Sequence, residues 1–435
     1  MKIRNPRVLA LPYPAQGHVF PLMELCLCLL KHGFTITFVN NEFIHERLMS
    51  ECKEKGDLGD QLRLVSLPDW LDPAKDKNKP RKTTEASEQL MQQKLEEPIA
   101  ETNGGGCIEN ITCVITDNHK GWALEVAAKM GIRRVAFCAI AATVFAWQIT
   151  VPNLIGDGII SNDLSPKAPA MNTRNFAWAR LGNLSMQKSA FQFFFSLDSE
   201  ATEVADLLIC NSSYELEPAA FDLAPGIIPV GPLLSNWLGN SVGHLWKEDS
   251  TFMYAAFGSF TSFDQTRFQE LVLGLELSNM PFLWVVRPNT VECKKEAYPP
   301  GFQDRGRTRG KIVHWAPQQK VLAHPSVACL LSHCGWNSAV EGVNSGLPFL
   351  CWPYFADQFL NESYICDEWK VGLRLSLMKA GSLRDMKLKL RWRQLVGDPR
   401  LRERALNLKE VALNSVREGG SSYNNLQHLA ERLKA

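Results

Sequence analysis

The sequence has little of what marks several large classes of protein. Its 47 Lys and Arg residues nearly balance 46 Asp and Glu residues, and a net charge of +1 gives no electrostatic reason to propose a nucleic acid or an anionic membrane as partner. The apolar run "LMELCLCLL" contains Glu24 and ends at Lys31, and no stretch reaches the length of a membrane span. The apolar residues after the basic N-terminus stop at Pro12, too early for a signal peptide.

Paired cysteines, repeats and low-complexity tracts are also missing. The 12 cysteines are scattered, and none has the Cys-x-x-Cys spacing of a zinc site. A chain of 435 residues does not need disulfides to stabilise its core. We therefore expect a soluble, cytoplasmic protein, without nucleic acid or membrane partners, that acts as a monomer.

What is present is a regular alternation of short apolar runs with longer helical patterns. The runs that favour buried strands are "RVLALP", "TITFVN", "CVITD", "RRVAFCA" and "DLLICNS" in the first half, and "MYAAFGSF", "FLWVVRP", "KIVHWAP", "VACLLSH" and "PFLCWPY" in the second. This alternation predicts an α/β protein with one parallel sheet in each half. In such sheets ligands bind beyond the carboxyl ends of the strands.

The length of the chain and a Gly, Pro, Ser and Asn-rich stretch near its middle, "GIIPVGPLLSNWLGNSVG", indicate two domains. We predict an N-terminal domain over residues 1–234, a linker over 235–250 and a C-terminal domain over 251–415. The last segment, residues 416–435, is predicted to be a helix that packs back on the N-terminal domain.

The most informative stretch, "ACLLSHCGWNSAVEGVNSGLP", joins a predicted strand to a predicted helix. A helix N-terminus presents backbone N–H groups and a partial positive charge, so it binds anions readily. His333, Asn337 and Ser338 are placed to bond phosphate oxygens, and Glu341, about one turn on, suits the two hydroxyls of a ribose. The alternative is that Asn337 and Ser338 only cap the helix and that Trp336 is a core residue. The residues alone leave both interpretations open.

The flanking segments add groups suited to a nucleotide and a sugar. Trp315 follows one predicted strand and could stack on a flat base, while the backbone near Ala316 could read the base edge. Asp357 and Gln358 follow another strand, and a neighbouring carboxylate and carboxamide suit the hydroxyls of a hexose. A helix N-terminal charge is the competing interpretation of Asp357.

The 44 residues from Trp315 to Gln358 resemble the signature box of plant secondary-product glycosyltransferases, the family 1 enzymes that use UDP-sugars. The resemblance extends over nearly the whole chain. It implies a GT-B fold, with two Rossmann-like domains facing across a cleft, the acceptor bound by the N-terminal one and the UDP-sugar by the C-terminal one. Because the box ends in glutamine, it is most similar to the enzymes that use UDP-glucose.

The resemblance also implies roles for single residues. The donor-binding residues are Trp315 and Ala316 for the uracil, Gln318 and Glu341 for the ribose, Ser259, His333, Asn337 and Ser338 for the diphosphate, and Trp336, Asp357 and Gln358 for the sugar.

The N-terminal counterpart is "LPYPAQGHVFPLMEL", where His18 lies at the head of a predicted helix after the first strand. An uncharged imidazole near neutral pH is a suitable general base, and we predict that His18 is catalytic. The resemblance supports this, and implies that Asp117 hydrogen-bonds the far side of the imidazole. A helix cap is the alternative for Asp117, and His119 is interpreted as a bystander.

The implied reaction is a single displacement that inverts the anomeric carbon and transfers a hexose to a hydroxyl of a small lipophilic acceptor, such as a phenolic, flavonoid or terpenoid. The sequence has no Asp-x-Asp tripeptide, so we expect no metal and no cofactor, the UDP-sugar being a co-substrate. Acceptor candidates are Phe137, Ala139, Phe145, Trp147 and the stretch "FQFFFSLD", for all of which core packing is the alternative.

The region 244–256 is shorter than the family pattern. A non-catalytic or unstable UDP-sugar-binding relative is therefore the second hypothesis. A nicotinamide dehydrogenase is a weaker third, because "PYPAQGHVFP" lacks the Gly-x-Gly-x-x-Gly spacing.

Overall fold

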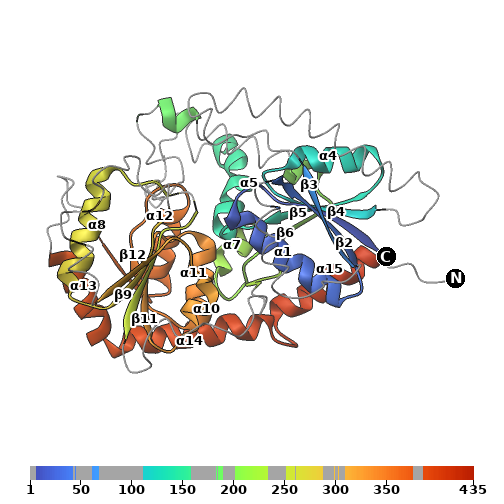
Figure 1. Ribbon diagram of the computed structural model, residues 1–435. Helices are drawn as coiled ribbons and strands as arrows, with labels where there is room; N and C mark the ends of the chain where they lie inside the picture. The colour runs from blue at the N-terminus through green and yellow to red at the C-terminus, as the bar shows by residue number, and fades with distance from the viewer. Residues whose placement is uncertain are drawn as a thin grey trace. The chain divides into compact units, whose positions relative to one another are not determined.

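The computed structural model describes residues 6–42, 61–67, 111–157, 185–189, 201–233, 251–259, 261–287, 309–375 and 386–435, with a few isolated residues between these ranges (Figure 1). The chain divides into two compact units. The first comprises Met1–Met171, Leu184–Ser235 and Ser415–Ala435, and the second comprises Asn172–Asn183 and Asn236–Asn414. The predicted linker and the stretch "FQFFFSLD" lie outside the described residues.

The first unit contains a parallel sheet that, among the described residues, has seven strands in the order β3-β2-β1-β4-β5-β6-β7. The strands are β1 (Arg7–Leu11), β2 (Thr35–Asn41), β3 (Leu62–Leu67), β4 (Ile111–Asp117), β5 (Arg133–Cys138), β6 (Leu207–Cys210) and β7 (Ile227–Pro229). The sequence order reverses between β1 and β4, which are direct neighbours with Leu11 opposite Thr116. The carboxyl ends of these two strands therefore form the topological switch point, where parallel α/β sheets bind ligands.

Five helices of this unit are described from end to end. They are α1 (Gln16–Lys31), α4 (Gly121–Lys129), α5 (Ala142–Gly156), α7 (Pro218–Leu223) and α15 (Ser421–Lys434). The buried Glu217 caps α5, since its carboxylate accepts from the backbone N–H groups of Ala142 and Thr143 over 2.9 Å each. Helix α15 joins the unit from the far end of the sequence, and the Asn425 side-chain amide donates to the Pro229 carbonyl over 2.9 Å.

The second unit repeats this architecture. Its described strands form a six-stranded parallel sheet in the order β10-β9-β8-β11-β12-β13. They are β8 (Phe252–Ala256), β9 (Phe282–Val285), β10 (Gly310–Val313), β11 (Val327–Ser332), β12 (Phe349–Cys351) and β13 (Gly372–Arg374). Here the order reverses between β8 and β11, with Ala256 opposite Ser332. A second switch point thus lies where these two strands end.

The helical segments of this unit are α8 (Gln265–Ser278), α10 (Gln318–Leu322), α11 (Trp336–Ser345), α12 (Gln358–Ser363), the π-helical turn Tyr364–Glu368, α13 (Met386–Gly397) and most of α14 (Pro399–Val416). Helix α11 ends at Gly346, which has a left-handed φ of 69°. Gly342 brings α11 close to the sheet, because a Cβ there would lie 2.4 Å from the ring of the buried Phe349.

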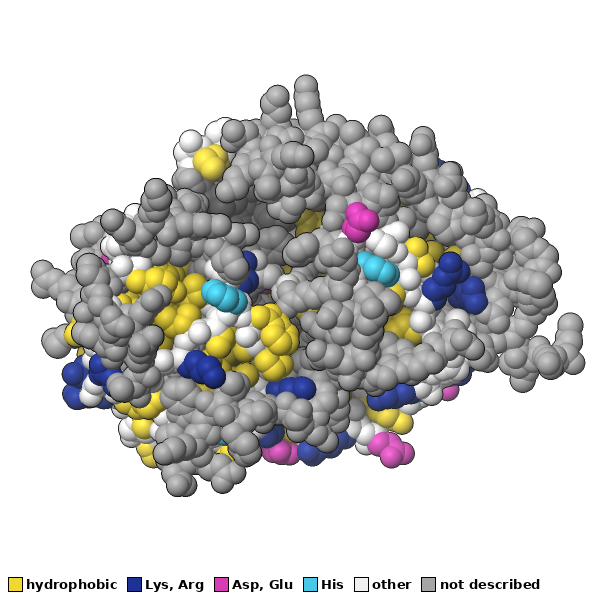
Figure 2. Space-filling view, viewed as in Figure 1, with side chains coloured by type: hydrophobic (Ala, Val, Ile, Leu, Met, Phe, Trp, Pro, Cys, Tyr) yellow, Lys and Arg dark blue, Asp and Glu magenta, His cyan; other side chains and the backbone are white. Residues whose placement is uncertain are grey.

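Strand β8 is the described part of the shortened region. It pairs with β9 on one side and β11 on the other, and all five of its residues are buried. Within the described residues, the first strand of the second sheet in sequence is therefore buried and paired. Among the described helices, none is both long and apolar enough to cross a membrane. The described residues on the face drawn in Figure 2 include charges of both signs, in keeping with the near-zero net charge.

Candidate active site

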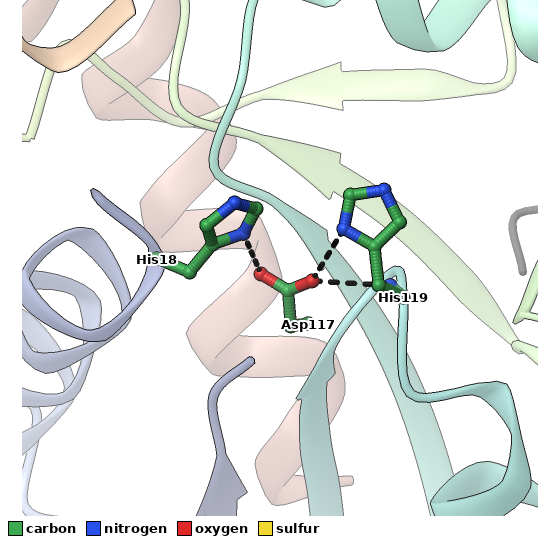
Figure 3. Close-up of side chains that lie close together, drawn as sticks. All are labelled: His18, Asp117 and His119. Atoms are coloured by element: carbon green, nitrogen blue, oxygen red, sulfur yellow. Dashed lines mark hydrogen bonds and ion pairs between the residues drawn. The ribbon is translucent and has the colours of Figure 1, made fainter. Parts of the chain in front are cut away.

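Two polar side chains meet where β1 and β4 end. His18 lies in the first turn of α1, just after β1, and Asp117 is the last residue of β4. The His18 Nδ1 lies 2.7 Å from Asp117 Oδ2, although the two residues are 99 positions apart in the sequence (Figure 3). The Asp117 side chain is fully buried, whereas 16% of the His18 side chain is exposed. A buried partner thus fixes the orientation of a partly accessible imidazole.

Asp117 is ionised and acts only as an acceptor. Burial by itself raises the pKa of this carboxyl group, but the neighbouring His18 and His119 outweigh burial and hold the pKa well below its usual value. Because the carboxylate has no proton, the His18 Nδ1 carries the hydrogen of their contact, and the lone pair of the neutral ring is on Nε2. This is the tautomer in which Nε2 can accept a proton.

His119, interpreted from the sequence as a bystander, also contacts the Asp117 carboxylate. Its backbone N–H donates to Asp117 Oδ1 over 3.0 Å, and its Nδ1 lies 3.2 Å from the same oxygen. The turn between β4 and α4 brings the imidazole back onto the carboxylate, which the sequence pattern did not show. The Tyr13 ring packs near both imidazoles, with centroid distances of 5.2 Å to His18 and 5.7 Å to His119.

The helix-cap alternative for Asp117 is wrong. Helix α4 begins at Gly121, and no side chain caps its N-terminus. The Asp117 carboxylate is instead occupied by the two histidines. In the described part of the chain, His18, Asp117 and His119 are also the one group of three or more His, Cys, Asp and Glu side chains whose ligand atoms lie within 4.8 Å of one another.

At the second switch point, two glycines hold His333 in place. A Cβ at Gly258, after β8, would lie 2.5 Å from His333 Nε2, and a Cβ at Gly335, before α11, would lie 2.4 Å from the same atom. Gly258 also has a left-handed φ of 69°. Burial, with a smaller contribution from the Arg287 cation, lowers the pKa of His333 to about 4. His333 is therefore neutral at pH 7 and can act there only as a hydrogen-bonding group.

Ser259 lies in the loop after β8, which is held by a side chain that sequence reasoning missed. The Arg287 guanidinium, just after β9, donates to the backbone carbonyls of Ser259 and, over 2.7 Å, of Thr261. Burial lowers the pKa of Arg287, yet the group stays charged at pH 7. Its place directly after an apolar strand, in "FLWVVRP", was the available signal.

Three predicted donor-binding residues lie together between α10 and α11. The Gln318 amide donates to Glu341 Oε2 over 2.6 Å and to Ser338 Oγ over 2.9 Å. The Gln319 amide donates to Glu341 Oε1 over 3.2 Å. Burial raises the pKa of Glu341, and the two amides oppose that increase. The carboxylate is thus oriented by neutral donors, and no cation neutralises it in these contacts.

The aromatic candidates differ from each other. Trp315 is 51% exposed, so its indole can stack on a base, and Ala316 beside it is half-buried. The Trp336 indole is only 2% exposed and packs near Trp369 at a centroid distance of 6.2 Å, which fits the core-packing alternative for its side chain. Asn337 is half-buried in the first turn of α11, and no side chain caps that helix.

Asp357 and Gln358 both bond within the protein. Asp357 Oδ2 accepts from the Asn361 amide over 2.9 Å, and the same amide donates to the Cys334 carbonyl. Gln358 Oε1 accepts from the backbone N–H groups of Tyr354 and Phe355 over 2.7 and 3.0 Å. The Gln358 oxygen therefore shapes the turn before α12, and the residue is only 4% exposed.

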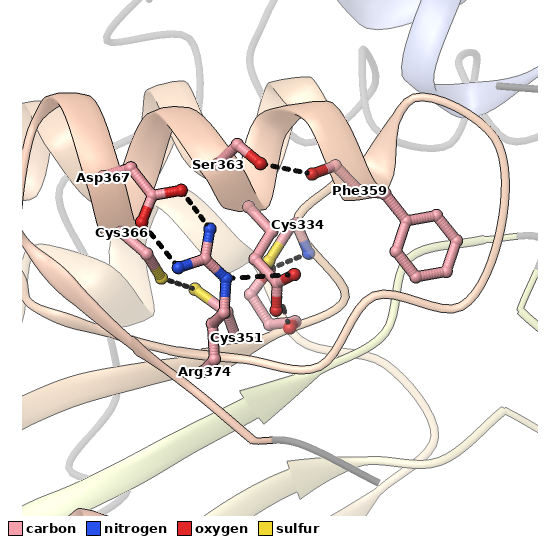
Figure 4. A network of polar contacts seen from close by, with 9 residues as sticks. Cys334, Cys351, Phe359, Ser363, Cys366, Asp367 and Arg374 are labelled. Atoms are coloured by element: carbon pink, nitrogen blue, oxygen red, sulfur yellow. Dashed lines mark hydrogen bonds and ion pairs between the residues drawn. The ribbon is translucent and has the colours of Figure 1, made fainter. Parts of the chain in front are cut away.

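An ionic and thiol network holds α12 and the π-helical turn against the end of the sheet (Figure 4). Arg374 of β13 donates to Asp367 over 2.6 Å and lies 3.5 Å from Glu362. The Cys366 thiol lies 3.7 Å from the Cys351 thiol of β12. These contacts fix the helix whose N-terminus carries Asp357 and Gln358.

The acceptor candidates are mostly core residues. Phe137, Ala139 and Phe145 are fully buried, and Phe145 belongs to an apolar cluster with α7 and β6 side chains. Trp147 on α5 is half-buried. Phe137 on β5 is the register partner of Asp117 on the neighbouring strand β4.

The chain is similar to known proteins over its whole length. Residues 249–412 match the family model "UDP-glucoronosyl and UDP-glucosyl transferase". UDP-glycosyltransferase 83A1 of Arabidopsis thaliana is 39% identical, with 100% of this chain and 98% of that protein aligned. Linamarin synthase 1 of Manihot esculenta is 32% identical, with 97% and 95% aligned.

Solved structures show the same fold. Os79 from O. sativa in complex with UDP is 25% identical, has a TM-score of 0.79, and is matched over 98% of this chain and 100% of that one. A UDP-glucosyltransferase from Polygonum tinctorium, 24% identical, has a TM-score of 0.84 over the full length of both chains and supports the fold alone. The molecule is thus a GT-B glycosyltransferase. The chain belongs to the plant family 1 UDP-glycosyltransferases.

Proposed function

We propose that this enzyme transfers glucose from UDP-glucose to a hydroxyl of a small lipophilic acceptor, with inversion at the anomeric carbon. The observation that carries the proposal is the 2.7 Å contact of His18 with a buried, ionised Asp117 at the end of β1 and β4. A neutral imidazole with its lone pair on Nε2 is the group that such a reaction needs to take the hydroxyl proton.

In the proposed reaction, His18 Nε2 accepts the proton of the acceptor hydroxyl while its oxygen attacks the anomeric carbon. The bond from that carbon to the diphosphate oxygen breaks, and UDP leaves. The Asp117 carboxylate then stabilises the positive imidazolium through the Nδ1 hydrogen bond. One displacement gives one inversion, so the product has the opposite anomeric configuration to the donor.

The donor is assigned to the residues around the second switch point. Trp315 would stack on the uracil, with Ala316 at its edge, and Gln318 and Glu341 would hold the ribose. The leaving diphosphate would lie at the N-terminus of α11, near Ser259, His333, Asn337 and Ser338. Helix dipole and side-chain donors would stabilise its charge, and the proposed reaction requires no metal.

The acceptor and the sugar are the finer parts of the proposal. Gln358, the last residue of the signature box, favours glucose as the transferred sugar. The names of relatives such as linamarin synthase 1 and 7-deoxyloganetin glucosyltransferase fit a small-molecule acceptor that receives glucose. Trp147 is the acceptor candidate that the geometry favours, since it alone among the four is partly exposed.

The test is to incubate the full chain with UDP-glucose, UDP-galactose and UDP-glucuronic acid and a panel of phenolic, flavonoid and terpenoid alcohols. Mass spectrometry detects transfer, and NMR of the product gives its anomeric configuration. We expect His18→Ala to lower kcat by at least about 10²-fold while UDP still binds. His428→Ala, an exposed histidine on α15, is the matched control.

The second candidate is a relative that binds UDP-sugars without transferring them, which the shortened 244–256 region motivated. Strand β8 is buried and paired on both sides, which argues against the unstable form of this hypothesis. The form that binds without transferring is decided by experiment. UDP binding by calorimetry, together with no transfer to any acceptor and no donor hydrolysis, would favour this candidate. Wild-type rates in His18→Ala would refute the assigned base.

A further inference from the structure

His18, Asp117 and His119 have the composition of a metal site as well as that of a catalytic pair. Two imidazoles approach one carboxylate from its two sides: His18 Nδ1 lies 2.7 Å from Oδ2, and His119 Nδ1 lies 3.2 Å from Oδ1. One ligand atom from each residue lies within 4.8 Å of the other two (Figure 3). The imidazole centroids are 5.4 Å apart with planes inclined by 56°, so the rings are not stacked.

The three side chains could bind a small divalent ion after their ligand atoms move closer together. A tetrahedral Zn²⁺ with bonds of about 2.0–2.2 Å needs ligand atoms roughly 3.3 Å apart. The His18 Nδ1, now 2.7 Å from the carboxylate, would move away by roughly half an ångström. Ligand atoms that are now as far apart as 4.8 Å would have to close by up to about 1.5 Å. The His119 backbone N–H, 3.0 Å from Asp117 Oδ1, would continue to orient the carboxylate as a ligand.

Charge and ligand type favour a transition metal. Asp117 supplies a carboxylate whose side chain is fully buried. Mixed nitrogen and oxygen ligands favour Zn²⁺, Co²⁺ or Cu²⁺ over Mg²⁺ and Ca²⁺, which prefer oxygen alone. With 16% and 10% of their side chains exposed, His18 and His119 leave a path for an ion to enter.

We propose that His18, Asp117 and His119 form a binding site for a divalent transition metal ion, and that its occupation inhibits transfer. A metal on the His18 Nδ1 takes the lone pair of that nitrogen, so the ring proton moves through solvent to Nε2. That is the atom which has to accept the proton of the acceptor hydroxyl. The ion also removes the Nδ1 hydrogen bond to Asp117. The inhibition rests on the proposed function, whereas the binding does not.

The experiment measures binding and transfer separately on the full chain. Zn²⁺ binding is followed by calorimetry, and Co²⁺ binding by visible absorption, which reports tetrahedral coordination. His119→Asn and His18→Asn are compared with His428→Asn, an exposed histidine on α15. We expect one ion per wild-type chain and per control chain, and binding at least about tenfold weaker in each site variant. Urea unfolding of each variant checks that it is folded.

Transfer is measured with added Zn²⁺ or Mg²⁺, relative to each variant's own rate in EDTA. Zn²⁺ should inhibit the wild type reversibly, Mg²⁺ should not, and His119→Asn should need at least about tenfold more Zn²⁺ for the same inhibition. Equal Zn²⁺ affinity in folded His119→Asn and in the control overturns the site. If transfer by the wild type is unchanged when the site is saturated with Zn²⁺, the proposed inhibition is wrong. If no acceptor is ever glycosylated, the Co²⁺ spectrum still decides whether the site exists.

Discussion

Replacing Asp117 by asparagine tests the tautomer on which the proposed mechanism depends. The substitution keeps the size of the side chain but gives it only one acceptor oxygen. The His119 backbone N–H, 3.0 Å from Oδ1, can only donate, so the asparagine oxygen has to face it. The NH₂ group then faces the His18 Nδ1, 2.7 Å from the former Oδ2. To accept this hydrogen bond, His18 has to carry its proton on Nε2.

The expected loss follows from that proton. His18 with hydrogen on Nε2 cannot take the hydroxyl proton, and the product imidazolium loses its buried counter-charge. The same replacement in the Ser-His-Asp proteases lowers kcat by about 10⁴-fold. We expect about 10³–10⁴-fold here, which is roughly 4–5.5 kcal/mol of transition-state stabilisation. The Kd for UDP should not change, because Asp117 is not among the residues assigned to the donor.

The assay is kcat and KM with UDP-glucose and one accepted phenol, with ¹⁵N NMR of the His18 ring to report the tautomer. Asp222→Asn, an exposed residue of α7, is the control. A folded Asp117→Asn enzyme with kcat within tenfold of wild type would refute the reasoning. So would an NMR signal that still places the hydrogen on Nδ1.

Three further predictions concern the second unit. Gly258→Ala should weaken UDP binding, measured by calorimetry, at least about tenfold, because the new Cβ would lie 2.5 Å from His333 Nε2 and the residue has a left-handed φ. Gly226→Ala is the control and should leave UDP binding unchanged, because nothing lies within 4 Å of its Cβ position. His333 has a folded pKa of about 4, below the usual 6.5, so its contribution to stability is complete above pH 6.5 and falls by up to ~3 kcal/mol as the pH drops to 4. When the unfolding free energy is measured in urea between pH 6.5 and pH 4, His333→Gln should lose the part of the pH dependence that His333 causes. The same pH dependence in His333→Gln and the wild type would contradict this prediction. Gly342→Ala should cost about 1–3 kcal/mol of unfolding free energy because it overlaps the buried Phe349 ring; a stabilised variant would show that the ring yields.

The sequence predicted the strands and their ends well, because buried parallel strands are short apolar runs and the groups that follow them are polar. It placed His18 after β1, Asp117 at the end of β4, and Trp336 and Asn337 at the start of α11. Each of these placements follows from a local feature of the sequence, such as an apolar run, a glycine or a change from strand to helix periodicity. The parallel pairing of β1 with β4 then follows from the fold class.

The sequence could not show which way side chains turn within a loop. His119 is two residues from Asp117, and its backbone N–H donates to that carboxylate in a turn that Asp and Asn favour. The pattern indicates such a turn but does not show where the His119 ring points. Arg287 reaches two carbonyls of another loop, and the Gln358 oxygen is used by the backbone of its own turn. In each case the decisive fact is a contact of one polar atom, which depends on dihedral angles and not on residue pattern.

Both units place their polar groups by the same physical rule but hold them differently. At the first switch point, a buried carboxylate fixes His18 by charge, so a change of charge at Asp117 should alter reactivity without altering shape. At the second, two glycines enclose His333 and leave its ring no room to turn, so added volume should alter binding without altering charge. An isosteric substitution is therefore the sharper probe of the first site, and a single added methyl group is the sharper probe of the second.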